Sequence, residues 1–227
     1  MFDIITDNLP NFQTFGFDGR EVLAWVLKSS PYRSIEQAVA SLAIFAHPET
    51  VAQTGGANIF RVIRCRNQDE RGIFVELPQG GRVMLDDNKP PTDALTWAHG
   101  IGRSQFRDVQ FNHLRAESEN VCVYTSLANI CMLPAFLSKL TDTDVGVRAA
   151  LQFRAVELFG EFLRASQRLA TKPPNYSELM WADTLPPVAN LEVAYRDAMR
   201  TKGSDRTTRS ARELGWFFSG FQPDPSL

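Results

Sequence analysis

The sequence predicts an α+β fold, a three-stranded antiparallel meander packed by helices, with a mostly helical C-terminal half. Three observations predict it. Residues 59–85 contain three stretches of alternating apolar and polar residues, separated by the polar turns NQDER and PQGG. Residues 18–46 contain two stretches that begin with helix-capping residues, and residues 142–170 repeat apolar residues at helical spacing. We expect one domain over residues 1–227, in which residues 171–187 could form a hinge.

Two helices are predicted near the start of the chain. Asp18 with Glu21 forms a capping-box pattern, which predicts a helix from about residue 19 to residue 28. Ser34 with Gln37 predicts a second helix through about residue 46. Two helices joined by a short turn also occur in helix-turn-helix DNA readers, but the second helix carries no Lys or Arg after Arg33. We therefore interpret the pair as a buried helical hairpin.

The predicted meander has an apolar face and a face with basic side chains. Its strands are predicted at residues 59–66, 72–77 and 82–85. The core face would hold Ile63, Cys65, Ile73, Val75, Leu77, Val83 and Leu85. Arginine beside an aromatic ring can bind phosphate and stack a base, and the alternative is a face that is solvated or covered by helices. The opposite face would hold the candidate nucleic-acid-binding residues Arg64, Arg66, Arg82 and Phe74, together with Glu76 and Met84.

The rest of the chain is predicted to be mainly helical. A short helix is expected at residues 90–98 and a strand at residues 106–111. The longest helix would begin at Asp142 or Asp144 and reach about residue 170, and further helices are expected near residues 188–200 and 206–218. The apolar stripe of the long helix would consist of Val147, Leu151, Ala155, Leu158, Phe162, Ala165 and Leu169.

Composition excludes several classes of protein. The chain has 227 residues, a formal net charge of -2, 44% hydrophobic residues and 22% charged residues, which excludes a disordered, collagen-like or disulfide-dense chain. No apolar stretch approaches the roughly 20 residues that span a bilayer, so no membrane partner is expected. We expect no signal peptide, because the N-terminal residues lack a basic segment followed by an apolar one. Cys65, Cys122 and Cys131 form no CxxC pair and predict reduced thiols in a cytoplasmic protein.

Residues 111–140 contain the strongest indication of chemistry. A strand-like run ends at Asn112-His113, a polar loop follows, and Asn129 comes 16 residues after His113. A stretch predicted to be helical then contains Ser138. A histidine has a pKa near neutrality, which suits a general base. The other two histidines stand at predicted helix ends, where we interpret them as structural.

This segment resembles the core of the HNH, or ββα-metal, nuclease family. In that family a His ends a strand, an Asn follows after a loop, and a helix supplies a metal ligand. The resemblance implies that His113 is the general base that activates water and that Asn129 holds the loop and orients the histidine. It implies metal-ligand positions at Asn112 and Ser138, with Mg²⁺ or Mn²⁺ as the cofactor if the protein is active. Asn112 stands where the family usually has Asp or His, and Ser138 where it usually has His or Asn, so the resemblance extends to a degenerate nuclease.

Other motifs carry less information. Asp86-Asp87-Asn88-Lys89 contains the D-x-K pattern of PD-(D/E)xK nucleases, but it precedes two prolines and is interpreted as a turn. The chain has no P-loop, no GxSxG and no HExxH. Two functional hypotheses follow. The first is an HNH-like nuclease, degenerate or active, that hydrolyses DNA with metal assistance. The alternative is a non-catalytic module that binds protein or nucleic acid in a larger complex.

Overall fold

The computed structural model of the protein describes residues 10–78, 81–202 and 205–221. Its strands are β1 (Ile44–Phe45), β2 (Val62–Arg64), β3 (Phe74–Glu76), β4 (Arg82–Asp86), β5 (Val109–His113) and β6 (Ile130–Pro134). Its helices are α1 (Gly19–Leu27), α2 (Ile35–Leu42), α3 (Pro48–Ala52), α4 (Lys89–Ala98), α5 (Ala135–Ser138), α6 (Leu140–Thr143), α7 (Val145–Phe159), α8 (Leu191–Lys202) and α9 (Arg206–Leu214). Within the described ranges, no helix is both long enough and apolar enough to cross a membrane.

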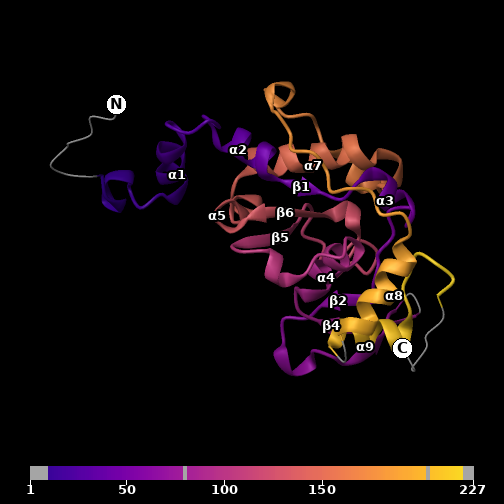
Figure 1. The fold of residues 1–227 in the computed structure, drawn as a ribbon. Coiled ribbons are helices and arrows are strands. Elements are labelled where there is room, and N and C mark those ends of the chain that lie inside the picture. The colour runs from indigo at the N-terminus through magenta and orange to yellow at the C-terminus, as the bar shows by residue number, and fades with distance from the viewer. Residues whose placement is uncertain (1–9, 79–80, 203–204, 222–227) are drawn as a thin grey trace.

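The strands form two sheets. The first has the order β1-β6-β5 with antiparallel pairing throughout. The second has the order β2-β4-β3, in which β2 runs parallel and β3 antiparallel to β4. Helices α2 and α7 lie along the first sheet, whereas α8 and α9 lie at the end of the molecule that holds the second sheet (Figure 1). The predicted α+β class is therefore confirmed.

The predicted antiparallel meander is wrong in its topology. The β3–β4 hairpin forms as expected, but β4 is the central strand and β2 lies on its far side. The reason is the segment after β2. Asn67 caps a short 3-10 helix, Gln68–Glu70, which carries the chain round to the other edge of β4, where the backbone N–H of Gly72 donates to Leu85 at 2.6 Å. Residues 67–71 thus form a crossover instead of a tight hairpin turn.

The predicted core face of this sheet is also wrong in part. Met84 and Val62 are fully buried in the main core, and Phe74 packs against it. Ile73, expected inside, has 48% of its surface exposed. Val83 is buried as predicted, so both faces of β4 are covered. When both faces of a strand are covered, apolar residues occur on both faces, so the alternation of apolar and polar residues does not show which face lies in the core.

The two N-terminal helices begin where their caps predict. The Asp18 carboxylate accepts the backbone N–H groups of residues 20 and 21, and the Ser34 hydroxyl accepts that of Gln37. Helix α2 is buried, but it ends at residue 42 because the next residues pair with β6 as β1. Helix α1 projects to one side of the molecule (Figure 1), and Trp25 and Val26 are exposed. The prediction of a buried helical hairpin therefore holds for α2 alone.

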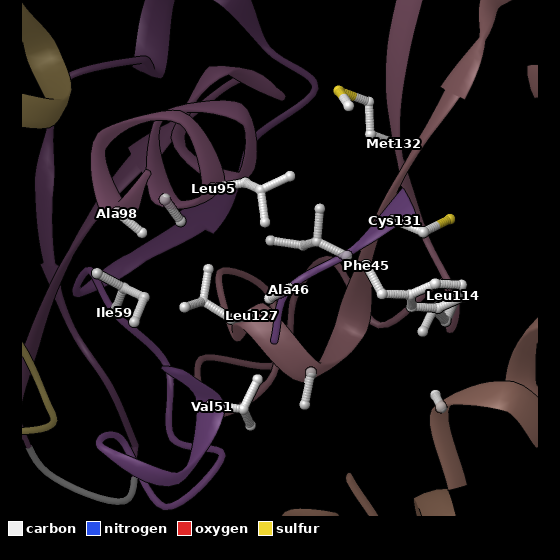
Figure 2. Close-up of a cluster of buried hydrophobic side chains, with 14 of the residues drawn as sticks. Phe45, Ala46, Val51, Ile59, Leu95, Ala98, Leu114, Leu127, Cys131 and Met132 are labelled. Atoms are coloured by element: carbon white, nitrogen blue, oxygen red, sulfur yellow. The ribbon is translucent and has the colours of Figure 1, made fainter. Parts of the chain in front are cut away.

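One hydrophobic core connects the two sheets. Phe45, Leu95 and Cys131 come from β1, α4 and β6, and their side chains lie around the same buried space (Figure 2). These elements are far apart in the sequence, so the core depends on long-range packing more than on local helix formation. The core cluster also reaches the last described residue, Phe221.

The long helix is shorter than predicted. Helix α7 stops at Phe159, and residues 160–162 and 165–169 form 3-10 turns after it. Its stripe is buried as far as Ala155, but the next buried position is Phe159 instead of Leu158, and Leu169 has 79% of its surface exposed. Gly160 ends the helix, because glycine is a poor residue for a helix interior.

Residues 171–187 do not form regular helices or strands apart from a short 3-10 turn, Tyr176–Glu178. The segment hydrogen-bonds to the N-terminal half of the chain. The backbone N–H of Ala182 donates to Ala40, and that of Leu185 donates to Phe45 at 2.8 Å. These bonds fix the connection to α8 along α2 and β1.

Candidate functional site

A strand, a loop, a second strand and a short helix carry the residues predicted to be catalytic. Strand β5 ends at His113, residues 114–129 form the loop, and α5 begins directly after β6. In the ladder between the strands, Asn112 pairs with Cys131 and His113 pairs with Ile130. The loop therefore starts and ends at neighbouring points of the sheet, which brings Asn129 beside the end of β5.

Asn129 binds the loop backbone. Its side chain is buried, with 1% of its surface exposed. Its Oδ1 accepts the backbone N–H of Arg115 at 3.0 Å, and its Nδ2 donates to the carbonyl oxygens of Arg115 and Val123, both at 3.2 Å. Three hydrogen bonds to backbone groups fix both ends of the loop. The side chain of Asn129 thus acts on His113 through the loop, without a hydrogen bond to the imidazole among those described.

His113 is held by Tyr124. The imidazole Nε2 lies 2.9 Å from the carbonyl oxygen of Tyr124, and the two rings stack with centroids 5.1 Å apart at 20°. A carbonyl oxygen can only accept a hydrogen bond, so Nε2 carries the proton in the neutral ring. Nδ1 has no hydrogen-bond partner among the described residues and is therefore the nitrogen that can accept a proton.

The surroundings keep His113 neutral. Burial lowers the pKa of His113 from its ordinary value of 6.5, and the charge of Arg64 lowers it further, while the bond to Tyr124 opposes both. Burial and a nearby cation both lower the pKa because both disfavour the positively charged imidazolium. At neutral pH the ring is in the basic form that a general base requires.

The predicted metal positions lie together but do not suit a bound divalent cation. The Ser138 hydroxyl donates to Asn112 Oδ1 at 2.9 Å, and the hydroxyl of Thr141 lies 3.5 Å from the same oxygen. These donors are neutral and already bonded to one another, whereas Mg²⁺ and Mn²⁺ are usually held by at least one carboxylate. Among the described residues, no group of three or more His, Cys, Asp or Glu side chains is placed to hold a metal ion.

A pocket of about 420 Å³ opens beside these side chains. His113, Asn112 and Ser138 all line it, so the structure brings together the residues that the sequence predicted at these three positions. Arg64 reaches the same pocket from β2, because its backbone N–H donates to the loop carbonyl of Ser118 at 2.9 Å. The remaining wall is mostly polar and is made by Asn88, Gln110, Phe111, Ala116, Ser118, Ala135, Lys139, Thr141 and Asp142.

The other predicted nucleic-acid-binding residues do not join Arg64. Arg66 is exposed and does not line the pocket. Arg82 forms an ion pair with Glu76 at 3.4 Å and lies over the ring of Phe74. Phe74 is half-buried, with a second guanidinium, from α9, over its ring. The predicted platform is split because β4 separates β2, which carries Arg64, from β3, which carries Phe74.

The D-x-K turn is engaged in ion pairs. Asp86 is fully buried, and its Oδ1 lies 2.6 Å from Arg206 Nε. Asp87 contacts the same guanidinium at 2.9 Å, and Lys89 lies 3.0 Å from Asp205 and also pairs with Asp93. The predicted turn is therefore only part of this segment: Asp86 ends β4, residues 87 and 88 connect it to α4, and Lys89 begins α4 with its ammonium group paired with two carboxylates.

Tyr124 is the main residue that sequence reasoning missed. It is buried, and its hydroxyl donates to the carbonyl of Asp87 at 2.5 Å. Its role depends on contacts with residues 11 and 37 positions away in the chain. No local spacing could indicate such contacts, although an aromatic residue inside a polar loop could have drawn attention.

Comparison of the chain with models of protein families, with curated proteins and with solved structures finds no match.

Proposed function

We propose that the His113 pocket is the site of a phosphodiester hydrolase with an HNH-like layout that acts on DNA. The observation that supports this most strongly is the arrangement of His113. It ends a strand, its Nε2 proton is committed to the Tyr124 carbonyl, and its Nδ1 is left as a base beside a polar pocket with a cation. A fixed tautomer and a neutral ring are what general-base activation of water requires.

In the proposed reaction, Nδ1 of His113 takes a proton from water as the water oxygen attacks phosphorus. The bond from phosphorus to the leaving ester oxygen breaks, and that oxygen receives a proton from solvent. Asn129 keeps the loop, and with it the Tyr124 carbonyl, at a fixed distance from the imidazole. No step of this reaction passes through Asn112 or Ser138, because their neutral oxygens do not fit a resident divalent cation.

The test is a nicking assay on supercoiled plasmid DNA, in EDTA and with added Mg²⁺ or Mn²⁺. His113→Ala should lower the rate about 10²–10⁴-fold, which is the usual contribution of a general base. His47→Ala is the matched control, because His47 caps α3 and does not line the pocket. Nicking by His113→Ala at the wild-type rate would overturn the proposal.

A second candidate function is a non-catalytic interaction module. Aromatic side chains on the projecting N-terminal part favour it, because Phe12, Phe17 and Trp25 have 52%, 65% and 47% of their surfaces exposed. Exposed aromatic residues are typical of surfaces that bind another protein. If the purified wild-type protein nicks no DNA under any of these conditions, this second function becomes the better interpretation.

A further inference from the structure

Two basic side chains line the His113 pocket, and one of them, Arg64, comes from the second sheet. Arg64 is the last residue of β2, and its side chain is exposed. The backbone around it is fixed on both sides, because Arg64 N–H donates to Ser118 in the loop and Cys65 N–H donates to Asp86 in β4 at 2.7 Å. The backbone that carries the Arg64 side chain at the rim of the pocket is therefore held by hydrogen bonds on both sides.

Arg64 is free to bind an anion. Arg71 and Arg206 nearby both pair with Asp87, at 3.7 Å and 2.9 Å. Arg64 forms no ion pair with any residue of the described ranges. The other cation that lines the pocket, Lys139, lies 3.4 Å from Asp142 on its own helical segment. A guanidinium without a carboxylate partner, beside a pocket whose walls are polar, suits an incoming anionic group.

We propose that Arg64 binds the phosphate group of the substrate in this pocket, and that this binding requires no divalent cation. Arginine can bind two phosphate oxygens at once with parallel N–H donors. Its charge would compensate the phosphate charge that a metal ion compensates in a metal-dependent nuclease. The neutral oxygens at Asn112 and Ser138 are consistent with this, because they would hold such a metal poorly. The proposal deepens the proposed function and rests on it for the identity of the anion as a phosphate.

The pocket also limits the size of the bound group. Its volume of about 420 Å³ falls in the range of small-molecule sites. It is thus large enough for one phosphate and the groups attached to it, so a DNA backbone would enter it one phosphate at a time.

The experiment uses inorganic phosphate as the probe and the full chain in EDTA, with chloride replaced so that ionic strength stays constant. NMR signals of the His113 ring and of the Arg64 guanidinium report binding. Wild-type protein should show saturable shifts of both groups. Arg64→Ala should weaken binding at least about tenfold, and Arg64→Lys should weaken it less, because Lys offers a charge without the paired donors.

The matched control is Arg66→Ala, which removes an exposed arginine that lies outside the pocket and should leave the phosphate affinity unchanged. Arg64→Ala should stay folded, because the Arg64 side chain is exposed and the hydrogen bond from residue 64 to Ser118 uses the backbone N–H, which alanine also has. The thermal midpoint of the variant checks this. Shifts that need added Mg²⁺ or Mn²⁺, unchanged binding by Arg64→Ala, or no saturable shift in the wild type would each overturn the proposal. Phosphate binding without plasmid hydrolysis would overturn the hydrolase proposal alone.

Discussion

Two polar regions of the molecule, the His113 pocket and a charged cluster at the N-termini of α4 and α9, contain similar residue types but differ in how their charges are compensated. The charged cluster consists of Asp86, Asp87, Lys89, Asp93, Asp205 and Arg206. Every charge in it has a partner, at 2.6 Å for Arg206 with Asp86 and 3.0 Å for Lys89 with Asp205. In the pocket, by contrast, Arg64 has no ion-pair partner among the described residues, and His113 Nδ1 has no hydrogen bond among them.

The difference separates stability from chemistry. Arg206 on α9 pairs with the fully buried side chain of Asp86 at the end of β4, so the cluster fixes α9 to β4. The pocket leaves one cation and one base available to a ligand. Tyr124 touches both regions, because its ring stacks on His113 while its hydroxyl donates to the Asp87 carbonyl. Residue types alone do not distinguish these regions, whereas the partners of each charge do.

The largest expected effect is on the charged cluster. Arg206→Met should lower the free energy of unfolding by about 3 kcal/mol, because it leaves the buried carboxylate of Asp86 uncompensated. Urea denaturation measures the loss. Arg200→Met on α8 is the control and should cost less than about 1 kcal/mol, since its pair with Asp197 is exposed. Equal losses of unfolding free energy in the two variants would mean that the charged cluster contributes no more to stability than an exposed ion pair.

Asn129 gives the next largest effect, because its side chain fixes the backbone of the loop that follows His113. Asn129→Ala should cost about 2–3 kcal/mol, because it leaves backbone groups of Arg115 and Val123 without partners in a buried place. Gln110→Ala, on the exposed side of β5, should change stability by less than about 0.5 kcal/mol. A midpoint for Asn129→Ala close to that of the wild type would mean that the loop does not depend on this side chain.

A smaller effect concerns the pH dependence of stability and His99, the residue that follows the last residue of α4. Burial lowers the pKa of His99 from 6.5 to about 4. The pKa of His99 is lower in the folded state than in the unfolded state, so the unfolded chain takes up a proton first as the pH falls. The protein therefore keeps its full free energy of unfolding above pH 6.5 and loses part of it as the pH falls toward 4. A fall in pKa from 6.5 to about 4 corresponds to about 3 kcal/mol, and because the His99 ring is only partly buried we expect a loss of about 1–2 kcal/mol. Urea denaturation of the wild type and of His99→Gln between pH 4 and pH 7 measures this loss, which should occur only in the wild type. The same dependence of unfolding free energy on pH in both proteins would contradict it.

The smallest effect connects Arg64 to His113. Removing the positive charge in Arg64→Ala should raise the pKa of His113, because Arg64 disfavours the imidazolium. An NMR titration of the His113 ring in both proteins measures the direction. Arg66→Ala should leave the titration of His113 unchanged. A fall in the pKa of His113 after the loss of Arg64 would mean that the two side chains are not electrostatic neighbours.

Local signals predicted much of the fold. The capping residues Asp18 and Ser34 placed the starts of α1 and α2, and the turn between β3 and β4 predicted their hairpin. The β1-β6-β5 sheet could not be predicted as well, because β1 has two residues and pairs with a strand more than 80 positions away. The parallel position of β2 depends on the path of residues 67–71, for which the sequence offers a hairpin turn as an equally good alternative.

The sequence predicted those parts of the candidate site whose residues are close together in the chain. Asn112, His113 and Ser138 lie in one segment, and they line one pocket. Arg64 was predicted to bind nucleic acid, but as part of a flat platform with Phe74, because alternation along strands says nothing about packing between two sheets. Tyr124 could not be assigned a role, since its contacts with His113 and Asp87 exist only in the folded chain.

The ring tautomer of His113 tests the central claim most directly. The claim is that Nε2 donates its proton to Tyr124 and that Nδ1 serves as the base. Nitrogen-15 NMR of the full chain at a pH above 8, where the ring is neutral, distinguishes a protonated from an unprotonated ring nitrogen. The account predicts a protonated Nε2 and an unprotonated Nδ1 in wild-type protein. A ring that carries its proton on Nδ1 would contradict it, because the nitrogen assigned as the base would then have no lone pair to accept a proton from water.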